Sequence, residues 1–456
     1  MRKIAELPIL ACSLGTRAIF IGRGIVRVRA GLTALVTVVL AAAAVGCTSS
    51  GGDDAPAAAT ATSTAGHSHT TTATALAADA SPREVRARFE QLLGQHALLA
   101  MRLARSEADK APDLQRVVQG SLAANSGALE QAVGVTFDST EAARFQQLWK
   151  GYTDDLAAYA DSAATGNSAG AQEARAALLD SCKDWGTWLA EASGGRVNGA
   201  EATRTAEARV DGLMDQADAY ADKDYAKAYK LERAAYQRTY GAGTALAEAS
   251  LPAKEAAGLD KAPEQLRSAF SMLLGEHMEL IVDAQRATFA GSPEFEAAAA
   301  QVNANTATLA KAMGGIVGPE KAAEFQRAWA NHVEGLMAYT AAVAGKDEAA
   351  KTVAKENLDG FAERLALYFS DVVSNVLATD PLTEAITAHD THLIDQVDAY
   401  AAKDYTRAQQ LQDDGYQQML GVANVLVDAI EKVMAADMPA GGSKTGGGGM
   451  AGHLHR

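Results

Sequence analysis

Cysteine is almost absent from this chain, which has only 3 among 456 residues. Cys12 and Cys47 lie in the N-terminal region described below, which leaves Cys182 alone in the rest of the sequence. If Cys47 is modified at its thiol and the residues before it are removed, no intramolecular disulfide is possible in the mature chain. Because Cys182 lies in a segment expected to be helical, we interpret it as a small packing residue rather than a nucleophile.

Proline and aromatic residues are scarce as well, with 10 prolines and 6% Phe, Trp and Tyr, although 48% of the residues are hydrophobic. Much of that content is alanine, which loses no side-chain entropy in a helix and lets helices approach closely. Basic residues are outnumbered by acidic ones, 41 to 56, which gives a net charge of −15. This balance argues against a nucleic-acid-binding protein that relies on a basic surface.

Convincing enzyme signatures are missing too. The sequence contains neither a P-loop nor an H-E-x-x-H motif. Its G-x-S-x-G string, residues 166–170, follows a helical pattern instead of the strand that a nucleophile elbow requires, so we expect a polar loop there. Enzymatic activity is left open, and a non-catalytic protein is favoured.

The N-terminal region is typical of an export signal. Residues 31–46 (GLTALVTVVLAAAAVG) form a short apolar run that follows three basic residues, Arg23, Arg27 and Arg29. The run is too short for a convincing membrane span and fits a secretory signal peptide. It ends in small residues directly before Cys47 and so resembles the lipobox of bacterial lipoproteins, although Ala44 replaces the usual leucine.

The lipobox resemblance implies that residues 1–46 are a lipoprotein signal peptide and that Cys47 carries the lipid. The protein is then expected to be exported and anchored to the outer face of the bacterial cytoplasmic membrane. An ordinary signal peptide with an incidental cysteine is the alternative. Residues 47–81, rich in Ala, Thr, Ser and Gly, predict a flexible tether, and residues 439–456 predict a disordered glycine-rich tail.

The rest of the chain contains an internal duplication. Residues 215–225 (DQADAYADKDY) recur as residues 395–405 (DQVDAYAAKDY), at an offset of 395 − 215 = 180. Two further blocks repeat at offsets of 180 and 181, AARFQQLW as AAEFQRAW and LLGQH as LLGEH. The sequence therefore predicts two copies of one unit, residues 82–252 and 263–438.

Each copy shows helical periodicity throughout and no alternating strand pattern. In the second copy apolar residues recur at i, i+3, i+4 and i+7 over six segments, residues 262–289, 293–313, 319–344, 348–377, 382–402 and 405–433. Short connections favour antiparallel neighbours. We therefore predict an all-α protein of two tandem antiparallel bundles, each with five or six helices and a core of its own.

Three histidines of the second copy lie within these apolar stripes. His277, His332 and His389 fall near the middle of the first, third and fifth helices. Because mid-helix positions of an antiparallel bundle share one level, we expect the three imidazoles to converge. His392, at i+3 from His389, can point to the same interior. Midway along the sixth helix, three more side chains could reach this layer: Tyr416, Gln418 and Met419.

The first copy is an internal control for this cluster. It has His96 where the second copy has His277, but Tyr152 replaces His332 and Arg209 replaces His389. Many large apolar positions are nevertheless shared by both copies. A shared scaffold with unshared interior polar residues is what a site confined to the second copy would look like.

The blocks around these histidines resemble a known family. LLGEH, FQRAWANH, AHDTHLIDQVDAYAAKDY and GYQQM are similar to the pattern of an exported bacterial helical domain, often found in tandem and sometimes annotated beside copper amine oxidase N-terminal domains. His277, His332 and His389 match the first three histidines of that pattern, and Gln418 stands where its fourth would be. The resemblance implies a histidine-lined bundle that can hold metal, and it implies no particular reaction.

Three neutral imidazoles with an open fourth position suit a transition metal, so we expect copper or zinc at His277, His332 and His389, with His392 or Gln418 as a further contact. A polar core is the alternative, in which the histidines bond to buried water or to a tyrosine, Tyr339, Tyr400 or Tyr416. An organic ligand or haem is a third. The function is accordingly either a metal-binding lipoprotein of the cell envelope or a structural lipoprotein that docks an envelope partner.

The membrane anchor can be tested directly. We expect the substitution Cys47→Ala to move the protein from the membrane fraction to the soluble fraction, because the thiol that would carry the lipid is removed. Cys182→Ala is the matched control and should leave the protein at the membrane. Persistence of the Cys47→Ala protein in washed membranes would contradict the lipoprotein interpretation.

Overall fold

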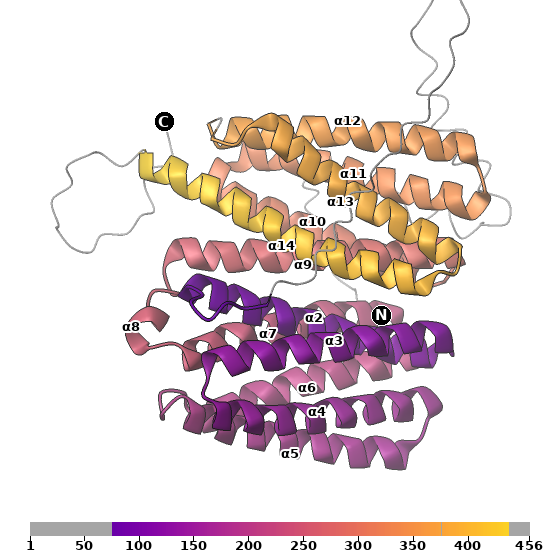
Figure 1. Cartoon of the computed structure of the whole chain (residues 1–456). Coiled ribbons are helices and arrows are strands. Elements are labelled where there is room, and N and C mark those ends of the chain that lie inside the picture. Colours follow the sequence, from indigo (N-terminus) through magenta and orange to yellow (C-terminus); the bar gives the residue numbers. More distant parts are fainter. Residues whose placement is uncertain (1–74, 375, 437–456) are drawn as a thin grey trace, which may run out of the picture. The chain divides into compact units, whose positions relative to one another are not determined.

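The computed structural model describes residues 75–374 and 376–436, and these residues are helical with no strands (Figure 1). The all-α prediction is confirmed. The predicted signal peptide, Cys47, the tail and the tether up to residue 74 lie outside the described residues. Within the described part, no helix is both long and apolar enough to span a membrane.

The first copy consists of six long helices and a short connecting helix. They are α2 (Pro82–Ala108), α3 (Pro112–Thr136), α4 (Ser139–Thr165), α5 (Ser168–Ala192), α6 (Gly199–Ala221), α7 (Tyr225–Ser250) and α8 (Ala253–Ala256). The G-x-S-x-G string lies at the turn between α4 and α5, where Gly166 ends α4 in the left-handed conformation with φ of 69°. Gly166 and Asn167 form the predicted loop, whereas Ser168 already begins α5, so the loop is shorter than expected.

The second copy repeats the six long helices. They are α9 (Ala262–Ala290), α10 (Phe295–Val317), α11 (Pro319–Gly345), α12 (Glu348–Val372), α13 (Thr379–Ala401) and α14 (Tyr405–Ala436). Most of these bounds lie within a few residues of those predicted from the apolar periodicity. Pro319 is the first residue of α11, where its missing N–H breaks no intrahelical bond.

Residues 75–81, at the end of the predicted tether, contact the first copy. Leu76 is buried in its hydrophobic core. The side-chain amide of Gln131 donates to the Leu76 carbonyl (3.2 Å) and its oxygen accepts from the Leu76 amide (3.3 Å). The part of the chain that packs on the bundle therefore begins before Pro82.

The repeated DAY…KDY block has a structural role. Asp224 and Asp404 are the residues before α7 and α14, and their carboxylates accept from the Lys227 and Arg407 amides, respectively. This is N-capping, which satisfies amides that a helix leaves free. Two further aspartates of the block, Asp218 and Asp398, lie at equivalent positions. They accept from the hydroxyls of Tyr159 on α4 and Tyr339 on α11, respectively.

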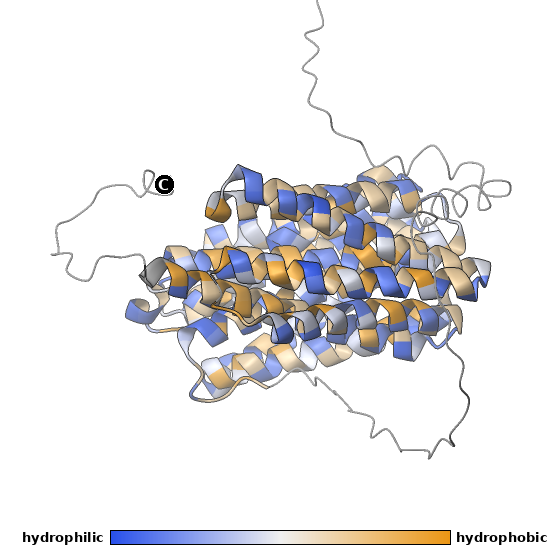
Figure 2. Cartoon of the chain, turned by 90° about the horizontal axis from the view of Figure 1, so that it is seen from above, coloured by the Kyte–Doolittle hydropathy of each residue, from blue (hydrophilic) through white to orange (hydrophobic). Residues whose placement is uncertain are grey.

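Each copy has its own hydrophobic cluster. Each helix carries both hydrophobic and hydrophilic residues, as expected when one stripe of each helix is buried (Figure 2). The first cluster takes in Tyr416 and Leu420 from the second copy, whereas the second takes in Tyr229 from the first. Independent folding of each copy stays a prediction, and the two copies belong to one compact unit.

The copies meet through α2, α3 and α7 of the first and α9, α10 and α14 of the second. At their junction the hydroxyls of Tyr236 and Tyr416, which are equivalent residues, lie 3.2 Å apart. The rings fit because glycines face them. A Cβ at Gly94 would lie 2.8 Å from the Tyr416 hydroxyl, and a Cβ at Gly275 would lie 2.8 Å from the Tyr236 hydroxyl.

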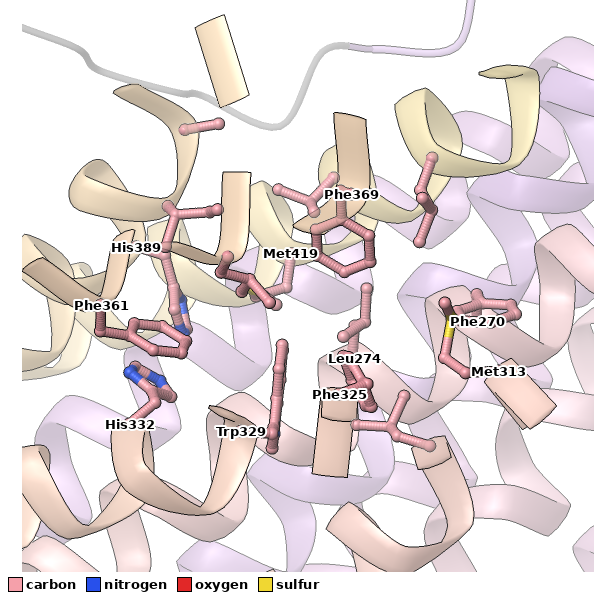
Figure 3. A pocket seen from close by; sticks show the side chains of 16 residues that line it. Phe270, Leu274, Met313, Phe325, Trp329, His332, Phe361, Phe369, His389 and Met419 are labelled. Atoms are coloured by element: carbon pink, nitrogen blue, oxygen red, sulfur yellow. The ribbon is translucent and has the colours of Figure 1, made fainter. Parts of the chain in front are cut away.

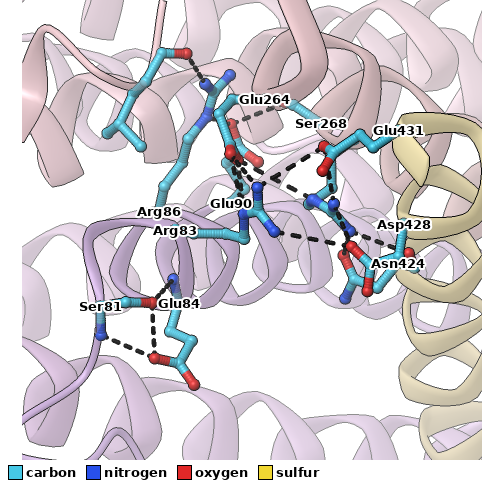
Figure 4. A network of polar contacts seen from close by, with 12 residues as sticks. Ser81, Arg83, Glu84, Arg86, Glu90, Glu264, Ser268, Asn424, Asp428 and Glu431 are labelled. Carbon is cyan, nitrogen blue, oxygen red and sulfur yellow. Dashed lines mark hydrogen bonds and ion pairs between the residues drawn. The ribbon is translucent and has the colours of Figure 1, made fainter. Parts of the chain in front are cut away.

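Ion pairs surround this junction. Near the start of α2, Arg83 bonds to Glu264 of α9, again an equivalent position, and also approaches Asp428 and Glu431 of α14 at 3.7 Å each (Figure 4). Other pairs are buried. Arg102 contacts Glu279, and a separate group joins Arg105 to two carboxylates, Glu232 and Asp283.

We predict that Arg105→Ala lowers the free energy of unfolding by about 3 to 5 kcal/mol, because it leaves the Glu232 and Asp283 carboxylates buried without their partner. Urea unfolding followed by circular dichroism measures the change. Arg116→Ala is the control, since Arg116 pairs with Asp113 at the surface and is 74% exposed. It should cost less than about 0.5 kcal/mol. Equal losses for the two variants would contradict a stabilising role for the buried group.

Candidate metal centre

The three predicted histidines converge in the second copy. His277 comes from α9, His332 from α11 and His389 from α13. Each offers a ring nitrogen, and these three atoms all lie within 4.8 Å of one another. The ring centroids are 5.7 to 5.9 Å apart. The sequence prediction that mid-helix histidines on alternate helices share one level is confirmed, and the group could hold a metal ion.

The three imidazoles are buried and short of hydrogen-bond partners. Their side chains belong to residues that are 0%, 1% and 4% exposed. Of their six ring nitrogens, five have no hydrogen-bond partner. The sixth, Nδ1 of His277, accepts from the indole nitrogen of Trp329 at 3.3 Å. Unpaired polar atoms in a protein interior are costly, and a buried water molecule or a metal ion would each satisfy nitrogens of this group.

Burial also keeps these histidines neutral. It lowers the pKa of His277 and of His332 well below the ordinary value, and neighbouring imidazoles lower it further. For His389 burial, with a smaller contribution from His392, lowers the pKa to about 3. A neutral imidazole keeps a lone pair on one nitrogen, so at pH 7 none of the three side chains has to lose a proton before it can bind metal.

Asp390 provides a carboxyl group next to the cluster. It is 4% exposed, and its Oδ1 lies 3.3 Å from Nδ1 of His332, without the alignment that a hydrogen bond requires. Burial, with repulsion from Asp359, raises the pKa of Asp390 well above its usual range. A carboxylate behind a histidine ligand commonly orients the ring and raises its basicity.

An apolar cavity of about 30 Å³ adjoins two of the histidines. His332 and His389 line it together with Trp329, Phe361 and Met419 (Figure 3). The His332 ring stacks on Phe361 with centroids 4.5 Å apart and 17° between the planes. The cavity has room for about two water-sized species. Apart from the two imidazoles and the Trp329 indole, its lining side chains are apolar.

Of the other residues expected near the site, His392 and Gln418 bond to backbone carbonyls, and Met419 reaches the cavity. His392 is half-buried, its Nδ1 lies 2.8 Å from the Ala388 carbonyl of its own helix, and it is not part of the three-histidine group. The Gln418 amide donates to the Ala385 carbonyl at 3.2 Å. Met419 does reach the cavity, as expected.

The tyrosines named for the polar-core alternative do not bond to the histidines. The Tyr339 hydroxyl donates to Asp398, and the Tyr416 hydroxyl pairs with that of Tyr236. Tyr400 packs on Phe289, which lies near the C-terminal end of α9. These groups therefore leave the imidazole nitrogens unsatisfied.

Sequence reasoning missed Asp390 and the indole of Trp329. Asp390 follows His389 directly, so it lies outside the helical spacing that identified the histidines. A position-by-position comparison of the copies contains a signal, because the equivalent residue, at 390 − 180 = 210, is Val210. An acidic residue therefore stands at this position only in the second copy, which has all three histidines.

The corresponding place in the first copy holds a fixed positive charge. His96 packs between Trp149 and Tyr152, with ring centroids 4.6 and 5.5 Å away. The Arg209 guanidinium lies over the Tyr152 ring, 5.2 Å from its centroid. Among the described residues, the three-histidine group of the second copy is the one set that could hold a metal ion.

Comparison of the whole chain with protein-family models, curated proteins and solved structures finds no match. The resemblance to exported tandem helical domains therefore stays a prediction. What the protein does has to be inferred from the geometry of the site.

The low pKa of His389 predicts a defined pH dependence. An unfolded histidine has a pKa of about 6.5, so between about pH 6.5 and pH 3 the unfolded chain takes up a proton that folded His389 does not. The stability associated with neutral His389 is therefore present above pH 6.5 and is lost as the pH falls. Each pH unit in this window costs about 1.4 kcal/mol.

His389→Phe removes this titrating group. The quantity to follow, with a chelator present, is the free energy of unfolding of the variant minus that of the parent. This difference should rise by up to about 1.4 kcal/mol for each unit of pH below 6.5. Urea unfolding of both proteins at pH 7.5, 6.0 and 5.0 measures the difference. A difference that does not change with pH would show that His389 is not held neutral in the folded protein.

Proposed function

We propose that the second copy binds one transition metal ion through His277, His332 and His389, and that the chain is a metal-binding lipoprotein of the cell envelope. The observation that carries the proposal is that one ring nitrogen from each of three buried imidazoles converges on the others, while five of the six ring nitrogens have no hydrogen-bond partner. Three imidazole ligands leave a coordination position open. The envelope location rests on the signal pattern and on Cys47.

Charge balance favours copper(I) over zinc(II). The three imidazoles are neutral, and Asp390 is the buried carboxyl group that approaches them. A monovalent ion together with ionised Asp390 would have no net charge, whereas zinc(II) would leave one uncompensated positive charge in an apolar interior. Imidazole also suits copper, and the thioether of Met419 lines the adjoining cavity. A bound cation would favour the ionised form of Asp390, whose pKa is raised by burial in the metal-free protein.

Trp329 connects metal binding to an optical signal. A neutral imidazole that accepts from Trp329 at Nδ1 carries its proton on Nε2. Binding of metal at Nε2 requires the other tautomer, in which Nδ1 and the indole would be two facing donors, so the Trp329 contact has to break. In the first copy the equivalent Trp149 already donates to a hydroxyl, that of Ser126, at 3.1 Å. Thr306 stands at the equivalent position in the second copy.

The central experiment is a titration of the purified chain with copper(I), in the presence of a competing chelator, and with zinc(II). We expect one tight copper(I) site per chain, with quenching of Trp329, the tryptophan of the second copy. Trp329→Phe separates this signal from that of the three tryptophans in the first copy: Trp149, Trp185 and Trp188.

Variants locate the site. His332→Ala should weaken tight binding by at least about 100-fold, since even a residue that only supports a ligand can contribute that much. His96→Ala, at the equivalent of His277, and His392→Ala should both leave the tight site intact. Four histidines outside the described residues are a source of weak binding that all variants share: His67, His69, His453 and His455.

The polar-core alternative predicts the opposite pattern. If the histidines only pack, His332→Phe should stabilise the protein, because it removes two unpaired nitrogens and keeps the ring against Phe361. Metal should then raise the thermal midpoint of the parent and of His332→Phe equally. Copper binding that is identical in the parent and in His332→Ala would contradict the proposal.

A further inference from the structure

The first copy contains a buried positive charge without a counter-charge. Arg209 on α6 is 4% exposed, and its Nε and Nη1 atoms have no hydrogen-bond partner. It makes no ion pair within the described residues. Its contacts are with aromatic rings, since the guanidinium carbon lies 5.2 Å from the centroid of Tyr152 and 5.8 Å from that of Trp185. Aromatic faces attract a cation but do not neutralise it.

The buried titratable groups beside Arg209 are uncharged at pH 7. Burial, and then the charge of Arg209, lowers the pKa of His96 to about 3. Burial raises the pKa of Tyr152, and it raises that of Cys182 to about 11. The buried group as a whole therefore carries one positive charge.

The acidic residues nearest in sequence do not pair with Arg209. Glu207 and Asp211 lie two positions before and after it on α6, so they project from other sides of the helix. Asp211 pairs with Arg175 at 2.6 Å, and both of those side chains are exposed. No carboxylate contacts the guanidinium from α4 or α5 among the described residues.

The duplication shows which counter-charge is absent. In the second copy Asp390 follows His389, whereas in the first copy Val210 follows Arg209. Val210 is completely buried. The first copy thus has a permanent cation where the second would hold a metal, and it lacks the carboxyl group that accompanies that site.

A small cavity lies against Arg209. Its volume is about 10 Å³, and its lining includes Tyr152, Ser181, Cys182 and Trp185. The Tyr152 hydroxyl is buried and has no hydrogen-bond partner. Arg209 and Tyr152, which carry unpaired N–H and O–H donors, therefore line a space with room for about one water-sized species.

We propose that this cavity binds a small monovalent anion, which the Arg209 guanidinium and the Tyr152 hydroxyl hold. Chloride is the physiological anion of this kind. An anion accepts from every donor in the group and neutralises the buried charge. A water molecule can accept from the donors, but it leaves the charge uncompensated.

The test is thermal unfolding of the full chain in sodium chloride and in sodium gluconate at the same ionic strength. Gluconate is too large for the cavity. Chloride should raise the midpoint of the parent by a few degrees over gluconate, in a saturable way, as a ligand of the folded state does. Arg175→Met removes an exposed arginine of the same copy and should keep the chloride effect.

Two variants decide the outcome. Val210→Asp supplies the internal carboxylate that the second copy has, and it should abolish the chloride effect. Arg209→Met removes the charge and should abolish it as well, which keeps the test decisive where Val210→Asp does not fold. Equal midpoints of the parent in the two salts, or a chloride effect that survives in Arg209→Met, would overturn the proposal.

Discussion

A polar side chain inside a helical bundle has to be satisfied by another group, and this requirement shapes both copies. At the junction between them it is met by buried ion pairs such as Arg102–Glu279 and Arg105–Asp283. At the three histidines of the second copy it is not met by protein atoms. A bound metal ion would satisfy one nitrogen of each of the three rings, which is why we place the function there.

The duplication separates scaffold from site. Both copies keep the aspartate N-caps of α7 and α14 and the tyrosine–aspartate bonds, and the two equivalent tyrosines, Tyr236 and Tyr416, join the copies. The interiors differ at the same level of the bundle. Three neutral rings and Asp390 in one copy correspond to a guanidinium and Val210 in the other. One fold thus presents two interiors of different charge.

Much of this could be predicted from the sequence, because helical periodicity fixes both the element and its buried face. The positions of His277, His332 and His389 followed from their place in apolar stripes at mid-helix. Periodicity alone does not give the direction of a side chain at the edge of a stripe. His392 is such a residue: its ring nitrogen lies beside a carbonyl of its own helix, and the side chain does not join the cluster. Asp390 and the ion pairs between copies depend on tertiary packing and carry no local signal.

The central claim is that the second copy, and not the first, holds one metal ion. Anomalous diffraction at the copper edge from crystals of the copper(I)-loaded chain tests it most directly. We predict one strong peak about 2.0 Å from a ring nitrogen of each of His277, His332 and His389, and none beside His96. A map from fully loaded protein with no peak at the three histidines would contradict the account.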